Sequence, residues 1–383
     1  MATTRRVLLL AGGSALLVSG VSWAMTRSPA KALAPWRTAT EGFDDPRLSI
    51  LAYAILAPSP HNMQPWQIEL KTDNALEVYC RPDRLLPETD PPNRQITIGF
   101  GCFLEVMRLA ASDFGYKTEV DLFPEGDPFY GDFDRPIARV QLDEMPNVEP
   151  DPLFQNVLGR RTNRSPFQAE TKPSKDDLEA IIATTLDVEG ILTEATQEDM
   201  LIRQLRELTR QAWKTEWYLD RTRRESIDVT HVGRNAIEAA PYGINLSGPV
   251  IEALNATGLF TAEKSGQVGT TAFDQSFEFY DKACATAQGY VWILTDGNTR
   301  ADQITAGAGW VRAHLAATGR GVAFHPLSQA LQEFPEMKVH YDAAHLMLQT
   351  RANQTVQMLA RVGFAAAPAP APREPLSAKI VPI

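Results

Sequence analysis

The sequence predicts an α+β fold made of two tandem pseudo-repeats in one chain. Two stretches match without a gap: "GCFLEVMRLAASDFG" begins at Gly101, "GAGWVRAHLAATGRG" begins at Gly307, and both carry Leu-Ala-Ala at the same offset and end on glycine. Short strand-like segments lie on either side of each stretch, and helical segments separate most of them. Because a sheet must cover its apolar face, this alternation predicts two similar halves, residues 44–145 and 150–364.

Each matched stretch predicts a largely buried helix. Its small residues allow a neighbouring backbone to approach closely, and the glycine at its end favours a helix C-terminus. Strands are expected where short runs of β-branched and aromatic residues occur. These runs cover residues 76–80, 138–142, 290–295 and 355–364.

The segments around the repeated part differ from one another. Residues 144–152 hold three prolines without periodicity and predict a linker. Residues 201–226 carry leucines at helical spacing and predict one amphipathic helix. The glycine-rich stretch that follows is too long for an ordinary connection, so we expect a lid insertion at about residues 217–273. The alanine- and proline-rich tail, residues 365–383, is expected to run extended over the surface.

The N-terminal segment, residues 1–35, predicts a signal or anchor segment. Arg5 and Arg6 precede an apolar stretch, a pattern that resembles a twin-arginine export signal, with cleavage expected near residues 30–32. An uncleaved membrane anchor is the alternative, because residues 7–25 are nearly long enough to span a bilayer. We therefore expect a periplasmic protein, or a membrane-anchored one if the signal stays.

Composition and the absence of certain motifs exclude several classes of protein. The 383 residues carry a formal net charge of −10, so no nucleic-acid partner is expected. Cys80, Cys102 and Cys284 have no CxxC spacing, so neither a disulfide scaffold nor a metal site is expected. Gly-x-Gly at residues 99–101 and 307–309 does not extend to GxGxxG, which excludes a dinucleotide-binding Rossmann motif.

A basic cluster stands in "GRRTNRSPF", residues 159–167. Arg160, Arg161 and Arg164 lie within five residues, together with Thr162. Guanidinium groups bind phosphate oxygens in pairs, and a hydroxyl adds a further donor. The cluster indicates either a monophosphate site or a solvated basic turn, and by itself it does not distinguish them.

A second stretch, "PSPHNMQPW" at residues 58–66, follows a helical segment and precedes a strand. With the basic cluster, it makes the chain resemble the nitroreductase superfamily of FMN-binding proteins. The matched motifs are Pro-Ser-x-x-Asn-x-Gln-Pro-Trp and Arg-Arg-Ser/Thr-x-Arg. The resemblance runs from about residue 48 to residue 376 and is weakest between residues 217 and 273. It implies an FMN-dependent nitroreductase fold and an FMN phosphate held by the arginine motif.

The order of the two motifs resembles a tandem, single-chain branch of that superfamily. Family members are dimers in which each flavin takes the arginine motif from one subunit and the proline-asparagine loop from the other. In this chain the first half has the loop without the arginine motif, and the second half has the reverse. The resemblance therefore implies a fused dimer with one FMN site between its halves, and a monomer in solution.

The resemblance also assigns roles within the loop. Ser59 and Asn62 are expected at the polar edge of the flavin ring, and Pro60 helps to fix the backbone. Gln64 is expected to brace the turn. Trp66 begins a strand, so we expect it in the core, with stacking on the ligand as the alternative.

Two further segments belong to the implied site. By alignment on Pro326, the backbone amides of Ser328 and Gln329 are expected to point at flavin N5, where an N–H stabilises the reduced ring. Near the C-terminus, Arg373 matches the closing Pro-Arg-Arg-Pro of the family, and Glu374 replaces its second arginine. That replacement weakens the expected contact of the tail with the phosphate.

Two histidines lie beside these segments. His61 is expected to face solvent and is not assigned a catalytic role. His325 adjoins the turn near flavin N5, where it is expected to pack with a hydrogen bond to backbone; a role as proton source is the alternative.

The resemblance implies an FMN-dependent oxidoreductase that passes hydride or electrons through flavin N5 to a small-molecule acceptor, nitroaromatic or quinone-like. No side chain is expected to act as a covalent catalyst. NAD(P)H is a doubtful donor, because an exported protein does not meet the cytoplasmic pool. The alternative is a non-catalytic protein that sequesters FMN or senses redox state beneath a lid.

Overall fold

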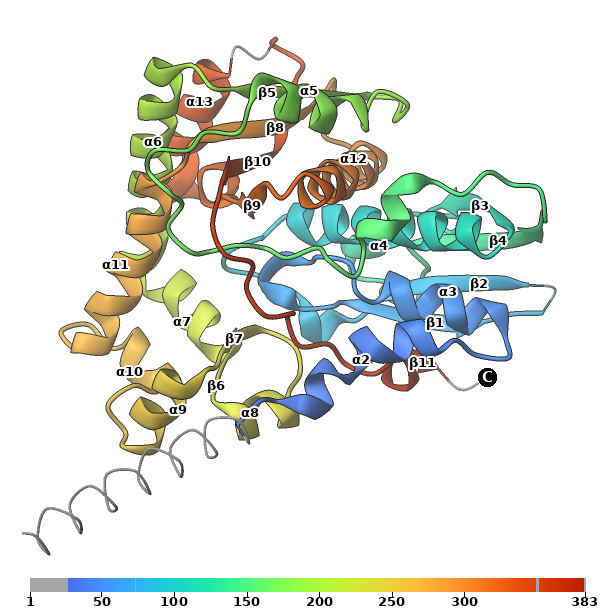
Figure 1. The fold of residues 1–383 in the computed structure, drawn as a ribbon, viewed down its shortest axis with the longest axis horizontal. Helices are drawn as coiled ribbons and strands as arrows, with labels where there is room; N and C mark the ends of the chain where they lie inside the picture. Colours follow the sequence, from blue (N-terminus) through green and yellow to red (C-terminus); the bar gives the residue numbers. More distant parts are fainter. Residues whose placement is uncertain (1–26, 73, 349–350, 382–383) are drawn as a thin grey trace, which may run out of the picture.

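Two β-sheets, one in each predicted half, frame the protein. The computed structural model describes residues 27–72, 74–348 and 351–381. Figure 1 shows the sheets on either side of two long central helices, α4 (Arg94–Asp113) and α12 (Arg300–Gly319). The predicted α+β class is confirmed.

The first sheet has the strand order β11-β1-β2-β4-β3. Its neighbours run antiparallel, except that β1 and β11 are parallel. Its strands are β1 (Trp66–Leu70), β2 (Ala75–Cys80), β3 (Tyr116–Leu122), β4 (Ala138–Glu144) and β11 (Ile380–Val381).

The second sheet has the order β5-β8-β10-β9, and all its neighbours run antiparallel. Its strands are β5 (Ile191–Thr196), β8 (Gly289–Thr295), β9 (Ala323–Pro326) and β10 (Thr355–Gly363). In both sheets the second strand along the chain leads into the long helix, and the following strand takes the edge position. Short helices precede the first strand of each: α3 (Pro46–Ala54) and α5 (Lys175–Ala183).

Helices α4 and α12 meet at their matched glycines. A Cβ on Gly101 would lie 2.0 Å from the carbonyl oxygen of Ile304 and 2.9 Å from Cα of Gly307. In turn, a Cβ on Gly307 would lie 2.1 Å from the carbonyl oxygen of Ile98. The two backbones are therefore in direct contact, which no larger residue permits. The apolar residues of both helices belong to one core cluster.

The predicted amphipathic helix over residues 201–226 is wrong as a single element. The structure has α6 (Asp199–Tyr218) and α7 (Asp220–Asp228). Leu219 separates them with an extended conformation, φ −78° and ψ 121°. The leucine spacing predicted the helical conformation but carried no signal for the break, because the residues around Leu219 have no helix-breaking chemistry.

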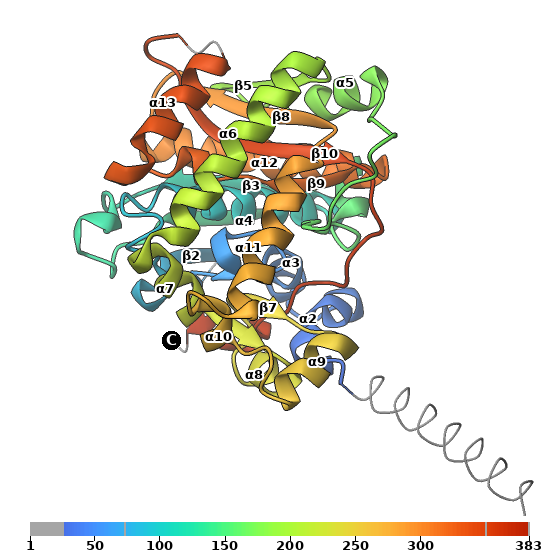
Figure 2. The same cartoon turned by 90° about the vertical axis from the view of Figure 1, so that its left-hand side faces the viewer.

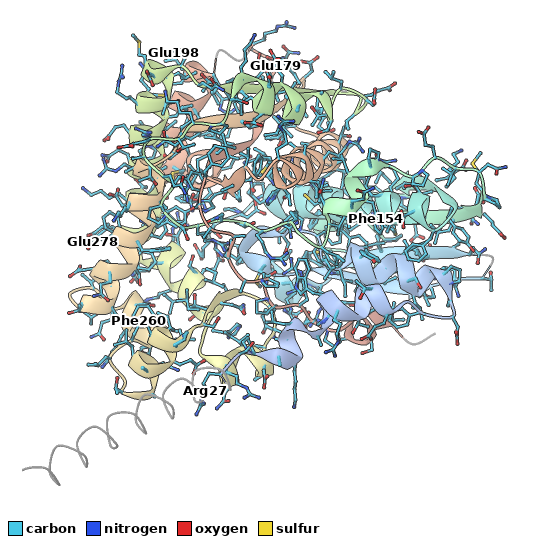
Figure 3. All side chains as sticks on the ribbon, viewed as in Figure 1. Arg27, Phe154, Glu179, Glu198, Phe260 and Glu278 are labelled. Atoms are coloured by element: carbon cyan, nitrogen blue, oxygen red, sulfur yellow. The ribbon has the colours of Figure 1, made fainter. Side chains whose placement is uncertain are left out.

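The region expected as a lid, residues 217–273, forms a small helical layer with a two-stranded parallel sheet, at the lower left of Figure 1 and in front in Figure 2. Phe260, labelled in Figure 3, packs in its apolar cluster with Val232 and Ala272. Its elements are β6 (Thr230–Val232), α8 (Arg234–Ala239), β7 (Ile244–Leu246), α9 (Pro249–Ala256), α10 (Ala262–Gly266) and the start of α11 (Thr271–Ala285).

Some shorter elements complete the fold. Helix α13 (Lys338–Met347) packs against α6. Single 3₁₀ turns are η1 (Pro60–Asn62), η2 (Pro82–Arg84), η3 (Pro128–Tyr130), η4 (Pro152–Asn156), η5 (Gln329–Leu331), η6 (Pro335–Met337) and η7 (Leu376–Ala378).

The last residues of the expected leader belong to the folded body. Helix α2 (Ala30–Glu41) begins within the segment assigned to residues 1–35. Ala32 and Trp36 are buried, and the carbonyl of Ala32 accepts a hydrogen bond from the backbone N–H of Arg373. The twin-arginine motif itself lies outside the described residues. Within the described parts, no helix combines the length and hydropathy that a membrane span needs.

The tail crosses from the second sheet to the first, and its burial corrects the expectation of a surface tail. It is partly exposed between residues 365 and 371, and then Arg373 and Lys379 are buried. Lys379 pairs with Glu374, which also accepts from Arg84 at 2.9 Å. The strand β11 then joins the edge of the first sheet (Figure 1). The proline and alanine content correctly predicted an extended backbone for the tail. The burial of Arg373 and Lys379 depended on residues far away in the chain.

The contact of α4 with α12 can be tested by adding one methyl group. We expect Gly101→Ala to lower the free energy of unfolding by about 1–3 kcal/mol, because its Cβ would meet backbone rather than a movable side chain. Gly159→Ala is the control, since its Cβ would come no closer than 3.4 Å to a neighbour. Urea unfolding measures both variants. Equal stability of the two would show that the helices can separate without cost.

Candidate functional site

A cavity of about 650 Å³ lies where the two halves and the 217–273 region meet. This volume is in the range of small-molecule and cofactor sites. Its wall includes the loop before β1, one face of α4, the arginine motif, and the turn after β9. Residues of helices α6, α7, α9 and α11 line the other side.

Six of the ten predicted site residues line this cavity, and they come from both halves. The first half contributes the loop and the second half contributes the arginine motif and the turn after β9. The six residues are Ser59, Pro60, Thr162, Arg164, Ser328 and Gln329. The other four do not line the cavity: Asn62, Arg160, Arg161 and Arg373. Asn62 is hydrogen-bonded to the tail, and Arg160 donates to the carbonyl of Leu56, just before the loop.

The loop backbone is strained. His61, Asn62 and Gln64 have φ values of 44°, 57° and 50°, which side chains with a Cβ rarely adopt. Such residues cost of order 1–3 kcal/mol each and persist where surrounding contacts enforce them. One of those contacts is local, because the Ser59 hydroxyl accepts a hydrogen bond from the backbone N–H of Gln64 at 3.0 Å.

Gln64 braces the loop, as predicted. Its side chain is fully buried, and its amide nitrogen donates to the carbonyl of Pro241 at 2.9 Å. Its amide oxygen accepts from the backbone N–H of Glu374 at 3.0 Å. The Lys379 ammonium donates to the Gln64 carbonyl at 2.7 Å. One glutamine thus ties the loop to both the lid region and the tail. Trp66 is fully buried in the core, as predicted.

Asn62 and Arg373 bind each other behind the loop. The Asn62 amide donates to the carbonyl of Pro372 at 3.1 Å, and its oxygen accepts from the Arg373 guanidinium. Arg373 also donates to the carbonyls of Leu56 and Ala57, at 3.0 and 3.1 Å. Both polar atoms of the Asn62 amide are therefore engaged, so in this structure the side chain holds the loop and does not line the cavity.

Four arginines gather at one end of the cavity without a carboxylate. Arg160 donates to the carbonyl of Leu56 at 3.0 Å, and Arg161 packs over the Trp36 ring at 4.6 Å. Neither these two nor Arg164 and Arg373 form an ion pair with a carboxylate that the structure describes. Burial lowers the pKa of Arg160 to about 10. Uncompensated buried charge of this kind is costly, and an anion would relieve it.

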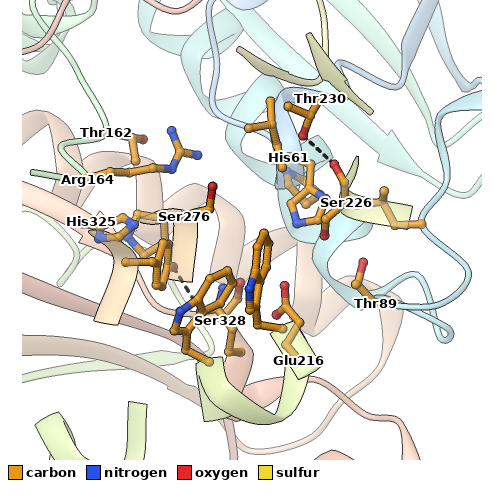
Figure 4. A pocket seen from close by; sticks show the side chains of 18 of the residues that line it. His61, Thr89, Thr162, Arg164, Glu216, Ser226, Thr230, Ser276, His325 and Ser328 are labelled. Carbon is orange, nitrogen blue, oxygen red and sulfur yellow. Dashed lines mark hydrogen bonds between the residues drawn. The ribbon is translucent and has the colours of Figure 1, made fainter. Parts of the chain in front are cut away.

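Arg164 is the guanidinium that faces the cavity. It forms no hydrogen bond with any described residue, and its side chain points into open space in Figure 4. It is accessible through the cavity, while the protein atoms around it lower its pKa through desolvation. Thr162 lies beside it with its hydroxyl in the same wall. This end of the cavity can therefore bind an anion with charge-assisted hydrogen bonds.

His61 lines the cavity, so the expectation that it faces solvent is wrong. Its Nδ1 is buried and has no partner among the described residues. Burial, followed by the charge of Arg164, lowers the pKa of His61 to about 4. The ring is therefore neutral at physiological pH.

His325 is packed as expected, but its partner is a side chain and not backbone. The Arg361 guanidinium donates to Nδ1 of His325 at 2.8 Å. Because Nδ1 accepts, the neutral ring carries its proton on Nε2. Burial and the charge of Arg361 hold the pKa of His325 well below its usual value. His325 therefore offers a neutral N–H at the cavity wall.

The turn after β9 presents two unused amides. The backbone N–H groups of Ser328 and Gln329 have no acceptor among the described residues, although neighbouring amides in the turn are bonded. Both residues line the cavity. The Gln329 side chain is held by the Tyr280 hydroxyl, which donates to it at 3.2 Å. A pair of free amides at a cavity wall is suited to binding a developing negative charge.

The sequence interpretation missed the opposite end of the cavity. Trp213, Glu216 and Trp217 line it from α6, and Ser226 lines it from α7. One signal was available: Glu216 falls between two tryptophans on the apolar face of an amphipathic helix, where a carboxylate is unusual. Among the described residues, no group of three or more His, Cys, Asp or Glu side chains could hold a metal ion.

Comparisons with known proteins give local sequence similarity to proteins described as nitroreductases. No protein-family model matches the chain. The chain is 30% identical over 155 residues to a Mycobacterium tuberculosis protein described as "Putative NAD(P)H nitroreductase acg", covering 40% of this chain and 44% of that protein. A second M. tuberculosis protein, "Putative NAD(P)H nitroreductase Rv3131", is 35% identical over 77 residues, 20% and 22% of the two chains. The chain thus spans less than half the length of these curated relatives.

A solved structure described as a "putative nitroreductase" from Anabaena variabilis covers more of the chain at lower identity. It aligns with 86% of this chain and 91% of its own, with a TM-score of 0.49 and 12% identity.

The protonation state of His61 reports the positive charge of Arg164 at the arginine end of the cavity. We expect NMR titration of the ligand-free protein to show His61 neutral from about pH 8 to pH 5, because burial and Arg164 disfavour its cation. Stability should fall as pH drops from about 6.5 toward 4, since the unfolded chain takes up this proton first. Inorganic phosphate should raise the pKa of His61 by offsetting Arg164.

The variant His61→Gln identifies the NMR signal of His61. The variant Arg164→Gln tests whether the charge of Arg164 lowers the pKa of His61, and it should raise that pKa without phosphate. A titration midpoint near the ordinary histidine value in the ligand-free protein would contradict the buried geometry.

Proposed function

We propose that this protein is an FMN-binding oxidoreductase of nitroreductase type. The observation that carries the proposal is the convergence of the proline-asparagine loop and the arginine motif on one cavity. These motifs are a hundred residues apart in the chain, and each is expected at the flavin in the superfamily that the sequence resembles. The local similarity to two proteins described as NAD(P)H nitroreductases supports the same class.

The arginine end fits the phosphate of FMN. Arg164 and Thr162 would hold the phosphate oxygens directly, since both face the cavity and Arg164 has no partner among the described residues. Arg160, Arg161 and Arg373 add positive charge close behind the wall. A dianionic phosphate would compensate the charge that no described carboxylate balances.

The middle of the cavity fits the flavin ring. Its wall has apolar surface from α4 and from β10, and Gly99 lets Pro60 approach so closely that a Cβ there would lie 3.3 Å from Pro60 Cδ. Ser59, His325 and the free amides of Ser328 and Gln329 supply polar contacts along it. When bound, FMN supplies hydride or electron transfer to a small acceptor, nitroaromatic or quinone-like; the protein binds, orients and tunes it.

We further propose that the chain is a fused dimer with a single site. Apart from β11, which the tail adds, the two sheets share one strand order, and the matched glycines meet where α4 and α12 cross. The loop occurs before β1 but has no counterpart before β5 in the sequence. Since the contact that two subunits would make is internal, the proposed oligomeric state is a monomer.

We favour catalytic turnover over FMN sequestration because the cavity reaches the protein surface. Val250 and Phe279 line it and are 70% and 52% exposed. An acceptor can therefore approach beside the lid region. We also propose that the protein is exported by the twin-arginine route. NAD(P)H is then a doubtful electron donor, because the exported protein does not meet the cytoplasmic pool. The alternative function is a lid-covered protein that holds FMN without turnover.

The phosphate contact is tested by Arg164→Ala. We expect FMN affinity to fall roughly 10- to 150-fold, because each lost charge-assisted contact is worth about 1.5–3 kcal/mol. Equilibrium dialysis with FMN measures the affinity. Arg203→Ala, an exposed arginine on α6, is the matched control and should bind FMN normally. Equal FMN affinity of the two variants would show that the phosphate binds elsewhere.

The redox role is tested with purified, FMN-loaded protein under argon. We expect dithionite and NADPH each to bleach the flavin absorbance, because an open cavity admits a donor to the ring. A nitroaromatic or quinone should then restore the yellow colour. Bleaching by dithionite alone would favour the sequestering alternative, and a protein that takes up no FMN would refute both.

A further inference from the structure

The cavity has a second polar end, opposite the arginines. Figure 4 shows Glu216 there, on the far side of the cavity from Arg164 and Thr162. Its side chain is 3% exposed and lines the cavity. One carboxylate oxygen accepts from the Gln332 amide at 2.9 Å. No ion pair joins Glu216 to any basic side chain that the structure describes.

Aromatic rings surround this carboxylate. Trp213 and Trp217 line this end of the cavity, with ring centroids 4.9 Å apart. Tyr280 lies between this end and the turn after β9, since its ring centroid is 4.4 Å from that of Trp213 and 5.3 Å from that of His325. No described arginine or lysine lies over any of these three rings. Aromatic faces beside a carboxylate are the chemistry by which proteins bind organic cations.

Buried hydrogen-bond acceptors without partners also favour a cation at this end of the cavity. Ser226 and Gln332 are more than nine-tenths buried and line the cavity, yet Ser226 Oγ and Gln332 Oε1 have no partner among the described residues. An ammonium group carries the donors that these oxygens lack. The indole N–H of Trp217 is also buried without a partner among the described residues.

The electrostatics of the neighbouring elements favour a cation. On α7, the Glu225 carboxylate accepts from the backbone amides of Glu88 and Thr89 and adds negative charge. The basic residue of α7 nearest this end, Arg223, is bonded to the carbonyls of Gly266 and Trp217 and to Asp220. Burial raises the pKa of Glu216 to about 7, opposed by Gln332 and reinforced by Glu225. A bound cation would stabilise the ionised form.

We propose that Glu216, Trp213, Trp217 and Tyr280 form a subsite for a small organic cation, an ammonium group carried on an apolar body. The subsite rests on the proposed function in one respect: FMN would occupy the arginine end of the cavity, and the electron acceptor would bind at the end that holds Glu216. Anion and cation then bind at opposite ends, each beside side chains of the opposite charge. The exposed Val250 and Phe279 mark the entry for such a ligand.

The test compares three ligands of one shape on FMN-loaded, full-length protein by isothermal titration calorimetry. At about pH 8, where Glu216 is ionised, we expect benzylammonium to bind at least about tenfold more tightly than benzyl alcohol, and benzoate more weakly than either. Glu216→Gln should abolish the preference for the cation and leave benzyl alcohol unchanged. Glu207→Gln, an exposed glutamate on the same helix, is the control and should keep the preference.

Two results would overturn the subsite: equal binding of the three ligands by the unmodified protein, or an unchanged preference in Glu216→Gln. The ligand comparison on unmodified protein remains decisive even if that variant fails to fold. Flavin absorbance, recorded on the same samples, reports the proposed function separately. Loss of the cation preference with full FMN content refutes the subsite alone. A protein that stays colourless after incubation with FMN, yet still prefers the cation, refutes FMN binding alone.

Discussion

Positive charge buried without a carboxylate is the constraint on which the site depends. Arg160 and Arg373 both donate to the carbonyl of Leu56, so the end of the first half's helical segment, the arginine motif and the tail converge at one backbone atom. Hydrogen bonds to carbonyls orient these guanidinium groups but leave their charge unbalanced. An anion in the cavity would lower the electrostatic cost of burying Arg160 and Arg373.

The tail contributes to the site through the loop rather than through direct contact with the cavity. It leaves the second sheet, places Arg373 behind Asn62, pairs Glu374 with the Gln64 side chain, and ends as a strand on the first sheet. These contacts hold three non-glycine residues at positive φ, a conformation that a free loop would abandon. Glu374, which departs from the expected second arginine, pairs with Lys379 and supports the loop instead of a phosphate.

The cavity itself is electrically asymmetric. One end has Arg164 and neutral histidines, and the other has Glu216 among aromatic rings. The two ends come from different parts of the chain: the arginine motif and loop from the paired halves, and the acidic end from the helices at residues 199–228. The acidic end thus comes in part from the region where the motif resemblance is weakest, residues 217–273.

The sequence by itself determined the α+β class, the matched central helices and the two motifs that meet at the cavity, because these depend on local periodicity and on residue types at fixed spacing. It also indicated that Gln64 braces the loop and that Trp66 is core. Only the tertiary structure decided that Leu219 divides a helix, that the tail is buried, and that His61 and Glu216 line the cavity. Burial, hydrogen-bond partners and pKa values arise from contacts between residues far apart in the chain, and no local pattern encodes them.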